Sequence, residues 1–223
     1  MEIIKVLSNC IKIYDKNLKN KTLMFITENK SRRLGVQEVF FGKSNFYHLT
    51  GVMVVDKSGK RISANSFYDL LLRGRIDAKN VIKVNSMTDL KLQVLPQLML
   101  IDRLANMIGD FDSSRILLQT EKIAGNTTAC MGFIKEEKYG RYVPNTVLKY
   151  DIRKAVVNRE KIVAILKKDV KEEKYRNVTY LKKGYDVIDL LNNTEINKYI
   201  DTDSIYSTSR VIQEKICDYL DSK

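Results

Sequence analysis

The spacing of apolar residues predicts a helix at the start of the chain and short strands after it. Residues 2–17 carry apolar side chains near every 3.6 positions, which is typical of an amphipathic helix. Residues 21–27 and 38–41 are rich in β-forming side chains, and the polar stretch 31–35 between them predicts a turn. Residues 47–55 continue as an expected strand. This part of the chain therefore predicts a hairpin and a third strand packed near the first helix.

Two further helices are expected in the next part of the chain. Ser63 or Asn65 can cap a helix that ends before Gly74, a residue well suited to a helix stop. A second helical period lies within residues 86–108, although Pro96 must kink this helix or mark its start. We expect the helix to start close to Pro96, because proline is tolerated in the first turn.

The pattern then changes to strands, and the chain ends in a helical tail. Helices are expected at 187–191 and 209–220. Short runs rich in β-forming residues predict strands at 115–120, 128–134, 143–150, 162–166 and 177–181. Helices followed by a run of strands favour an α+β fold with an antiparallel sheet over the regular alternation of an α/β fold.

Composition predicts a folded protein outside the membrane. Hydrophobic residues make up 44% of the 223 residues and charged residues 30%, so the chain can bury a real core. Its apolar stretches are too short for a membrane span, and Lys5 and Lys12 interrupt what would be the apolar part of a signal peptide. The three cysteines are far apart, which predicts a reducing, cytoplasmic compartment, no zinc site and no cofactor. Any bound metal would have to use carboxylate ligands.

Charge is unevenly distributed along the chain. Residues 1–185 contain 35 Lys and Arg against 19 Asp and Glu, a net charge of +16, whereas residues 186–223 contain 4 against 8, a net charge of −4. This reversal predicts a boundary near residue 185, between a main domain and an acidic extension. A basic body indicates a polyanionic partner, most simply nucleic acid, although solubility and codon bias give an alternative explanation.

Candidate chemistry centres on the only histidine. The glycine-rich nucleotide-binding motifs and the hydrolase elbow are absent. In the segment 43–51, strand alternation would place His48 on one face with Phe46 and Thr50. Histidine exchanges protons near neutral pH, as cleavage of an RNA phosphodiester requires. The alternative is a histidine with a core or capping role.

A second candidate region combines cations with tyrosines. Residues 131–185 contain 15 Lys and Arg against 7 Asp and Glu. Lys and Arg contact phosphates, and aromatic rings stack on unpaired bases, so this region favours binding to a single strand. Ordinary solvated strand faces would give the same composition. The side chains predicted to bind nucleic acid are Lys149, Arg153, Lys167, Lys168, Tyr175 and Arg176.

Four motifs in order resemble a known family. The chain is similar to the phage-associated nucleases of the barnase, EndoU, colicin and RelE-like superfamily over roughly residues 1–185. The motifs that carry the resemblance are Phe46-Tyr47-His48-Leu49-Thr50-Gly51, Ala64-x-Ser66-Phe67-Tyr68, Tyr142-Val143-Pro144-Asn145-Thr146 and Lys174-Tyr175-x-x-Val178-x-Tyr180.

This resemblance implies a fold, a reaction and a set of site residues. It implies an N-terminal helix and inserted helices packed on a curved antiparallel sheet, in a protein of a phage or mobile element acting in the bacterial cytoplasm. It implies metal-independent RNA cleavage, in which the 2′-OH attacks the adjacent phosphate. His48 is then the candidate acid or base, and Arg73 and Lys43 are the candidates for charge stabilisation. Thr146, which lies in a turn expected around residues 143–146, is the candidate for a hydrogen bond to the phosphate.

Two other functions remain open. The protein could be a non-catalytic phage anti-defence factor that binds nucleic acid, or a host protein or nucleoprotein, through its basic surface. Alternatively, the acidic tail could mimic nucleic acid, and either fold over the basic face or bind another protein.

Overall fold

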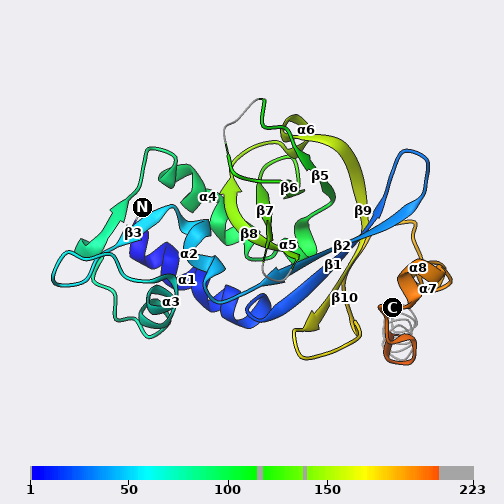
Figure 1. Ribbon diagram of the computed structural model, residues 1–223, viewed down its shortest axis with the longest axis horizontal. Coiled ribbons are helices and arrows are strands. Elements are labelled where there is room, and N and C mark those ends of the chain that lie inside the picture. Colours follow the sequence, from blue (N-terminus) through cyan, green and yellow to red (C-terminus); the bar gives the residue numbers. More distant parts are fainter. Residues whose placement is uncertain (1, 115–117, 138–139, 206–223) are drawn as a thin grey trace, which may run out of the picture.

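A closed barrel of seven strands forms the centre of the molecule in the computed structural model, which describes residues 2–114, 118–137 and 140–205 (Figure 1). The strands follow the order β1-β2-β8-β7-β6-β5-β9, and β9 pairs again with β1 to close the barrel. An eighth strand, β10 (Asn177–Leu181), extends the sheet along β9. The barrel strands are β1 (Lys21–Glu28), β2 (Leu34–Phe41), β5 (Met107–Phe111), β6 (Lys122–Gly125), β7 (Cys130–Glu136), β8 (Arg141–Leu148) and β9 (Val156–Asp169).

Strand pairing is antiparallel except between β2 and β8, which run parallel and meet at Val39 and Tyr142. The long strand β9 makes closure possible, because its first part pairs with β5 and its second part pairs with β1 on one edge and β10 on the other. The fold is thus α+β with a curved sheet, as expected, and the sheet curves far enough to close.

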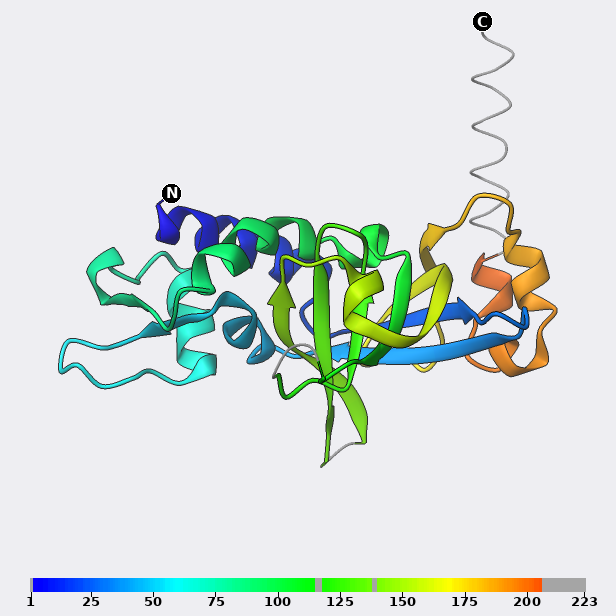
Figure 2. The same ribbon diagram turned by 90° about the horizontal axis from the view of Figure 1, so that it is seen from above.

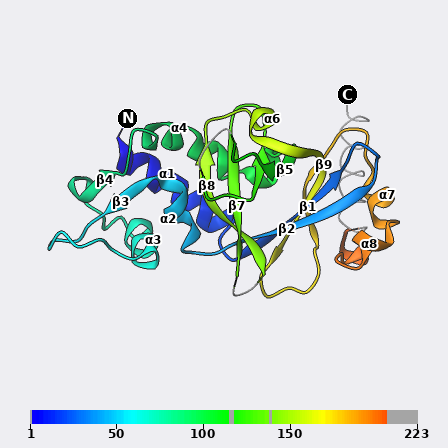
Figure 3. The same cartoon turned by 45° about the horizontal axis from the view of Figure 1, so that its top comes forward.

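Helices α1 (Ile3–Asn17), α2 (Asn45–Thr50), α3 (Ala64–Leu72) and α4 (Thr88–Leu98) gather at one end of the barrel (Figures 1 and 3). At the same end lies a small second sheet of β3 (Val52–Val54) and β4 (Val81–Lys83), and the 3₁₀ turn η1 (Ala78–Asn80) leads into β4. Helix α5 (Ile101–Leu104) packs against β9 and β10, and α6 (Ile152–Ala155) lies beside β5, β6 and β9.

The largest hydrophobic core joins this helical end to the barrel. It contains buried residues of α1, α2, α3 and α4 together with Phe25, Phe41 and Phe133 from the strands. Tyr14 of α1 lies near its centre, where its ring contacts Phe46 and its hydroxyl donates to the backbone oxygen of Gly42 at 2.7 Å. Each large apolar side chain buried here contributes about 1.5–3 kcal/mol. The core therefore fixes α2 against the barrel.

The C-terminal segment packs on the outside of the barrel, at the end away from β3 and β4 (Figure 2). Helices α7 (Val187–Leu191) and α8 (Thr194–Asn197) bury Leu190, Leu191 and Ile196 beside strand residues such as Met24. Helix α7 confirms the prediction at 187–191, whereas the helix expected at 209–220 lies outside the described residues. The described helices include none long and apolar enough to cross a membrane.

Several sequence predictions are confirmed. Helix α1, the hairpin of β1 and β2, and strands β7, β8 and β10 form where the pattern placed them, and the strand expected at 162–166 lies inside β9. Helix α3 is capped by the Ser63 side chain, which accepts from the Ser66 backbone N–H, and Gly74 follows it with φ of 65°.

The strand expected at 47–55 is wrong. The chain forms α2, turns at Gly51 and only then enters β3. Four of the six residues of α2 are buried, so the helix has a nearly continuous apolar run that resembles a buried strand. The proposed sharing of one strand face by Phe46, His48 and Thr50 is therefore also wrong.

Three expectations around the middle of the chain also need correction. Helix α4 starts at Thr88, and Pro96 lies in its last turn, where it removes one backbone hydrogen bond and the helix ends two residues later. Ile108 belongs to β5 instead of the helix. Of the strand expected at 115–120, residues 115–117 lie outside the described residues and 118–120 are not in a strand, whereas the short strand β6 was missed.

Candidate functional site

Helix α2 presents His48 on its exposed face while its other side chains hold it in the core. The neighbouring Tyr47 is buried, and its ring stacks on Phe67 of α3 with centroids 4.5 Å apart. The Tyr47 hydroxyl also accepts from the Val54 backbone N–H at 3.0 Å. His48 itself is exposed. The imidazole is thus displayed on a rigid support, as a group that must meet a substrate requires.

Lys91 of α4 and Thr146 of β8 are joined by a hydrogen bond beside α2. The Lys91 Nζ donates to the Thr146 Oγ1 at 2.9 Å, and Thr146 is 4% exposed. Desolvation by burial lowers the pKa of Lys91 below its ordinary value of 10.5. Helix α4 therefore brings a partly buried cation to the strand that carries the predicted phosphate-binding threonine.

Positive charge surrounds His48. Partial desolvation, followed by the positive charges of Arg61 and Lys91, holds the pKa of His48 below its ordinary value of 6.5. Arg61 is exposed, and its guanidinium lies 5.4 Å from the centroid of the Tyr47 ring. We refer to His48, Arg61, Lys91 and Thr146 as the histidine cluster. At neutral pH its imidazole is mostly uncharged, while its two cations provide an environment suited to an anion.

A bulge in β8 positions Thr146. The register between β7 and β8 shifts so that Gly132 lies opposite Thr146 and Phe133 lies opposite Pro144, which leaves Asn145 without a direct partner. Asn145 Oδ1 accepts from the Thr120 hydroxyl at 3.2 Å. A side chain at Gly132 would come within 2.8 Å of methyl groups of Thr120 and Thr146. The turn expected around 143–146 is therefore a bulged strand, packed too tightly for Thr146 to move freely.

Gly51 links α2 to Lys91. Its φ is +69°, and a Cβ atom there would lie 2.9 Å from the Lys91 Cδ. Its backbone oxygen accepts from the Thr88 hydroxyl at 2.7 Å. This residue therefore ends the histidine helix and leaves room for the lysine beside it.

Replacing Gly51 with alanine is expected to lower the free energy of unfolding by about 1–3 kcal/mol, through left-handed backbone strain and the overlap with Lys91. Gly59→Ala is a matched control, because Gly59 has φ of +82° and nothing within 4 Å of its Cβ position. Chemical denaturation should show a larger loss for Gly51→Ala than for Gly59→Ala. Equal losses would mean that only backbone strain matters and that Lys91 adapts.

Two of the predicted catalytic residues lie apart from the histidine cluster. Lys43 Nζ pairs with Asp69 Oδ2 at 2.6 Å and lies 5.8 Å from the ring centroid of Tyr68. Arg73 is exposed at the end of α3, and within the described chain no contact joins it to His48 or Thr146. Of the four predicted catalytic residues, His48 and Thr146 share a neighbour, Lys91, which donates to the Thr146 hydroxyl and whose charge acts on His48.

Two of the predicted nucleic-acid-binding side chains serve the interior of the fold instead. Tyr175 is fully buried, and its hydroxyl donates to the Glu38 carboxylate at 2.6 Å, so its ring offers no face to a stacked base. Lys167 Nζ lies 2.6 Å from the carboxylate of Asp102, which is completely buried. Sequence composition does not distinguish such residues from surface cations.

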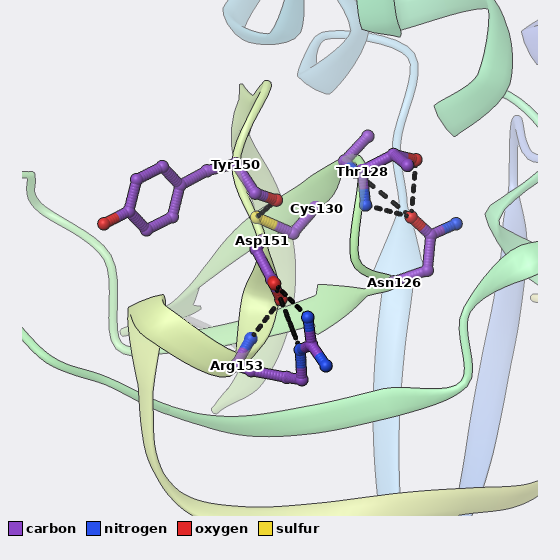
Figure 4. A network of polar contacts seen from close by, with 7 residues as sticks. Asn126, Thr128, Cys130, Tyr150, Asp151 and Arg153 are labelled. Carbon is purple, nitrogen blue, oxygen red and sulfur yellow. Dashed lines mark hydrogen bonds and ion pairs between the residues drawn. The ribbon is translucent and has the colours of Figure 1, made fainter.

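The other four predicted binding residues lie at or near the surface, each with an intramolecular partner. Lys149 donates to Gln93 at 2.8 Å, and Lys168 donates to the backbone oxygen of Glu173 at 2.7 Å. Arg176 pairs with Asp201 at 2.9 Å. Arg153 folds back onto Asp151, the cap of α6, with a shortest contact of 2.6 Å (Figure 4). The ion pairs of Arg153 and Arg176 are exposed and therefore weak, so a phosphate can compete for these cations.

Arg61 and Lys91 were missed because nothing near them in sequence marks them. Arg61 follows a polar turn, and Lys91 is one lysine on an amphipathic helix. Their nearness to His48 depends on long-range packing of α2, α4 and the loop after β3. The sequence places Lys91 on the amphipathic helix α4, but the spacing of Lys91 from the apolar positions does not show that the helix packs beside His48.

Cysteines and metal ligands offer no second centre in the part of the chain described. Cys10 and Cys130 are buried and unpaired, and burial raises the pKa of each thiol to about 12. Cys217 lies outside the described residues. No three His, Cys, Asp or Glu side chains among the described residues come together as they would around a metal ion.

An exposed imidazole beside two cations, one of which donates to the Thr146 hydroxyl, makes this α+β protein suited to acid-base chemistry next to an anionic group. The chain belongs to the phage-Barnase-EndoU-ColicinE5/D-RelE like nuclease4 family, whose model matches residues 6–184. The resemblance predicted from the four motifs is therefore confirmed, and the family implies a nucleic acid substrate. No curated protein and no solved structure matches the chain significantly.

Proposed function

We propose that this protein is a metal-independent ribonuclease that cleaves RNA by attack of a 2′-OH on the adjacent phosphate. The observation that supports it most directly is the placement of the only histidine beside Arg61 and Lys91, in a chain that belongs to a nuclease family. Because an uncharged imidazole can accept a proton at neutral pH, the reaction needs no metal-bound hydroxide as its base.

In this proposal His48 is the general base. Its lowered pKa keeps the imidazole uncharged at neutral pH, so it can take the proton of the attacking 2′-OH. A bond then forms between the 2′-oxygen and phosphorus, and the bond from phosphorus to the 5′-oxygen breaks. The products are a 2′,3′-cyclic phosphate and a free 5′-OH.

The other members of the histidine cluster serve the phosphate and the leaving group. Arg61 stabilises the negative charge that develops on the phosphate oxygens, because its guanidinium carries several charged N–H donors. Lys91 gives the proton to the leaving 5′-oxygen, which the lowering of its pKa by burial favours. Thr146, held by Lys91, donates a hydrogen bond to a non-bridging oxygen. In this proposal Arg61 takes the charge-stabilising role that the sequence assigned to Arg73 and Lys43, and Lys91 supplies the acid.

Incubation of the purified protein with structured RNA in EDTA tests the reaction. We expect cleavage that leaves 2′,3′-cyclic phosphate and 5′-OH ends, detected by resistance of the fragments to direct 3′ ligation and by mass spectrometry. Replacing the 2′-OH at the cut position with hydrogen should abolish cleavage there. Cleavage that requires added Mg²⁺ and leaves 5′-phosphates would contradict the proposal.

The second candidate is the non-catalytic anti-defence protein. The basic body, with a net charge of +16 over residues 1–185, is the observation that favours it. Tight RNA binding that weakens steeply with salt, with no cleavage under any condition, would support it in place of the ribonuclease.

A further inference from the structure

A basic groove lies between the β1–β2 turn and the first part of β9, away from the histidine cluster. Its volume is about 550 Å³. The described residues that line it and the adjoining hollow along β9 are Glu28, Asn29, Lys30, Ser31, Arg32, Met107, Arg153, Val156, Asn158, Arg159, Glu160 and Lys161. In Figures 1 and 3 the β1–β2 turn points to the end of the molecule opposite α2, α3 and the small sheet.

The lining of this groove is positively charged. Among the described residues it holds five Lys and Arg side chains against the two carboxylates of Glu28 and Glu160. Lys30 and Arg159 are exposed, and neither forms an ion pair within the described chain. An excess of exposed cations without carboxylate partners is a suitable site for phosphate groups.

A β-bulge places Arg159 on the groove. The pairing of β5 with β9 shifts by one residue between Ile108 and Asp110, and Asn158 in the shifted stretch has φ of 47°. Gly109 lies opposite this stretch, and a Cβ atom there would come within 2.7 Å of the Val157 backbone oxygen. Bulges of this kind redirect side chains, and here the redirected residue is a cation.

The hairpin on the other side of the groove is also conformationally constrained. Arg32 has φ of 57°, and the Asn29 side chain accepts from the backbone N–H groups of Ser31 and Arg33 at 2.9 and 3.0 Å. Two of the three non-glycine residues with positive φ among the described residues therefore border this groove. A side chain in this conformation costs about 1–3 kcal/mol, which the surrounding fold must offset.

We infer that this groove is a second binding site for the phosphodiester backbone of the RNA, separate from the cleavage site. The identity of the polymer rests on the proposed function, whereas the recognition of phosphates rests on the groove alone. Because α2, which carries His48, and the β1–β2 turn lie at opposite ends of the molecule (Figure 3), only a polynucleotide can occupy both sites. The groove therefore selects long or folded RNA over short fragments.

The test uses the full-length protein with two exposed cations of the groove neutralised, Lys30→Gln together with Arg159→Gln. Its matched control is Lys5→Gln together with Lys12→Gln, which removes the same charge from the exposed face of α1. The probe is an uncleavable 2′-O-methyl RNA hairpin, titrated by fluorescence anisotropy at several salt concentrations. Binding of a DNA duplex of the same sequence tests whether the groove binds the phosphodiester backbone of DNA as well as that of RNA.

The groove variant should bind the RNA hairpin about tenfold or more weakly at low salt, and the slope of log K against log salt should fall by about two. The affinity of the control for the RNA hairpin should fall much less. Equal affinities for the groove variant and the control would overturn the inference.

Cleavage of a dinucleotide separates this inference from the proposed function. A dinucleotide is too short to span both sites, so the groove variant should cleave it at the wild-type rate. If the wild type cleaves no RNA at all but the groove variant still loses affinity, the proposed reaction fails and the binding site stands. If the groove variant cleaves the dinucleotide more slowly by the same factor by which it binds the RNA hairpin more weakly, the groove is not a separate site.

Discussion

Replacing His48 with alanine is expected to lower the rate of RNA cleavage by about 10²–10⁴, the contribution typical of a general base. The fold should survive, because the imidazole is exposed on α2 and the buried neighbours Tyr47 and Leu49 hold the helix. Binding of the uncleavable RNA hairpin should change little. Single-turnover cleavage and the thermal unfolding midpoint together distinguish lost chemistry from lost structure, and full activity in His48→Ala would remove this residue from the mechanism.

The pH at which cleavage is lost should depend on the cations around His48. The base must be neutral, so the rate is present above the pKa of His48 and lost as the pH falls through it. Because desolvation by burial, and then the charges of Arg61 and Lys91, lower that pKa, the midpoint of the acidic limb should lie below 6.5, the ordinary value for histidine.

Arg61→Gln should move this limb to higher pH, because it removes a positive charge that disfavours the imidazolium. Lys43→Gln removes an equal charge from a residue paired with Asp69, and it should leave the limb in place. A purely structural role for Arg61 would lower the rate without moving the limb.

The sequence predicted the elements that depend on local pattern more reliably than the relations between them. Helix α1 and the β1–β2 hairpin were foreseen, because their periodicity and turn signals are local. Helix α2 was mistaken for a strand, because it is only six residues long and four of these residues are buried. Closure of the barrel could not be read from the chain, since it depends on β9 pairing with both β5 and β1.

In the candidate site too, the sequence identified the residues with a local signal and missed those that depend on long-range packing. His48 was singled out because it is the only histidine, and Thr146 because of the motif around it. Arg61 and Lys91 could not be assigned, because packing of α4 and the loop after β3 brings them to α2 from 13 and 43 residues along the chain. The sequence contains many cations and does not show which of them the fold places beside His48.

The same difficulty applies to Lys167, which the sequence placed on a nucleic-acid surface. The structure assigns it to Asp102, a carboxylate that is completely buried and whose Oδ1 has no hydrogen-bond partner in the described chain. The Lys167 side chain is 16% exposed, so little of it remains for a ligand. Buried charge of this kind is tolerated only while its partner is present.

Lys167→Met is therefore expected to lower the free energy of unfolding by about 3–5 kcal/mol, because it leaves the Asp102 carboxylate buried and unpaired. Lys168→Met is the matched control next to it in sequence. Lys168 donates only to a backbone oxygen and lies 4.7 Å from the ring centroid of Tyr175, so its loss should cost about 1 kcal/mol or less. Urea denaturation at neutral pH compares the two.

Replacing both partners separates a charge effect from a packing effect. Asp102→Leu combined with Lys167→Met removes the buried charge together with its counterion, and such exchanges are often close to neutral. The double variant should thus recover most of the stability lost in Lys167→Met. If it is as unstable as the single variant, the lysine stabilises the fold through the packing of its aliphatic chain. If Lys167→Met instead keeps wild-type stability and loses RNA affinity, Lys167 belongs to the binding surface that the sequence first indicated.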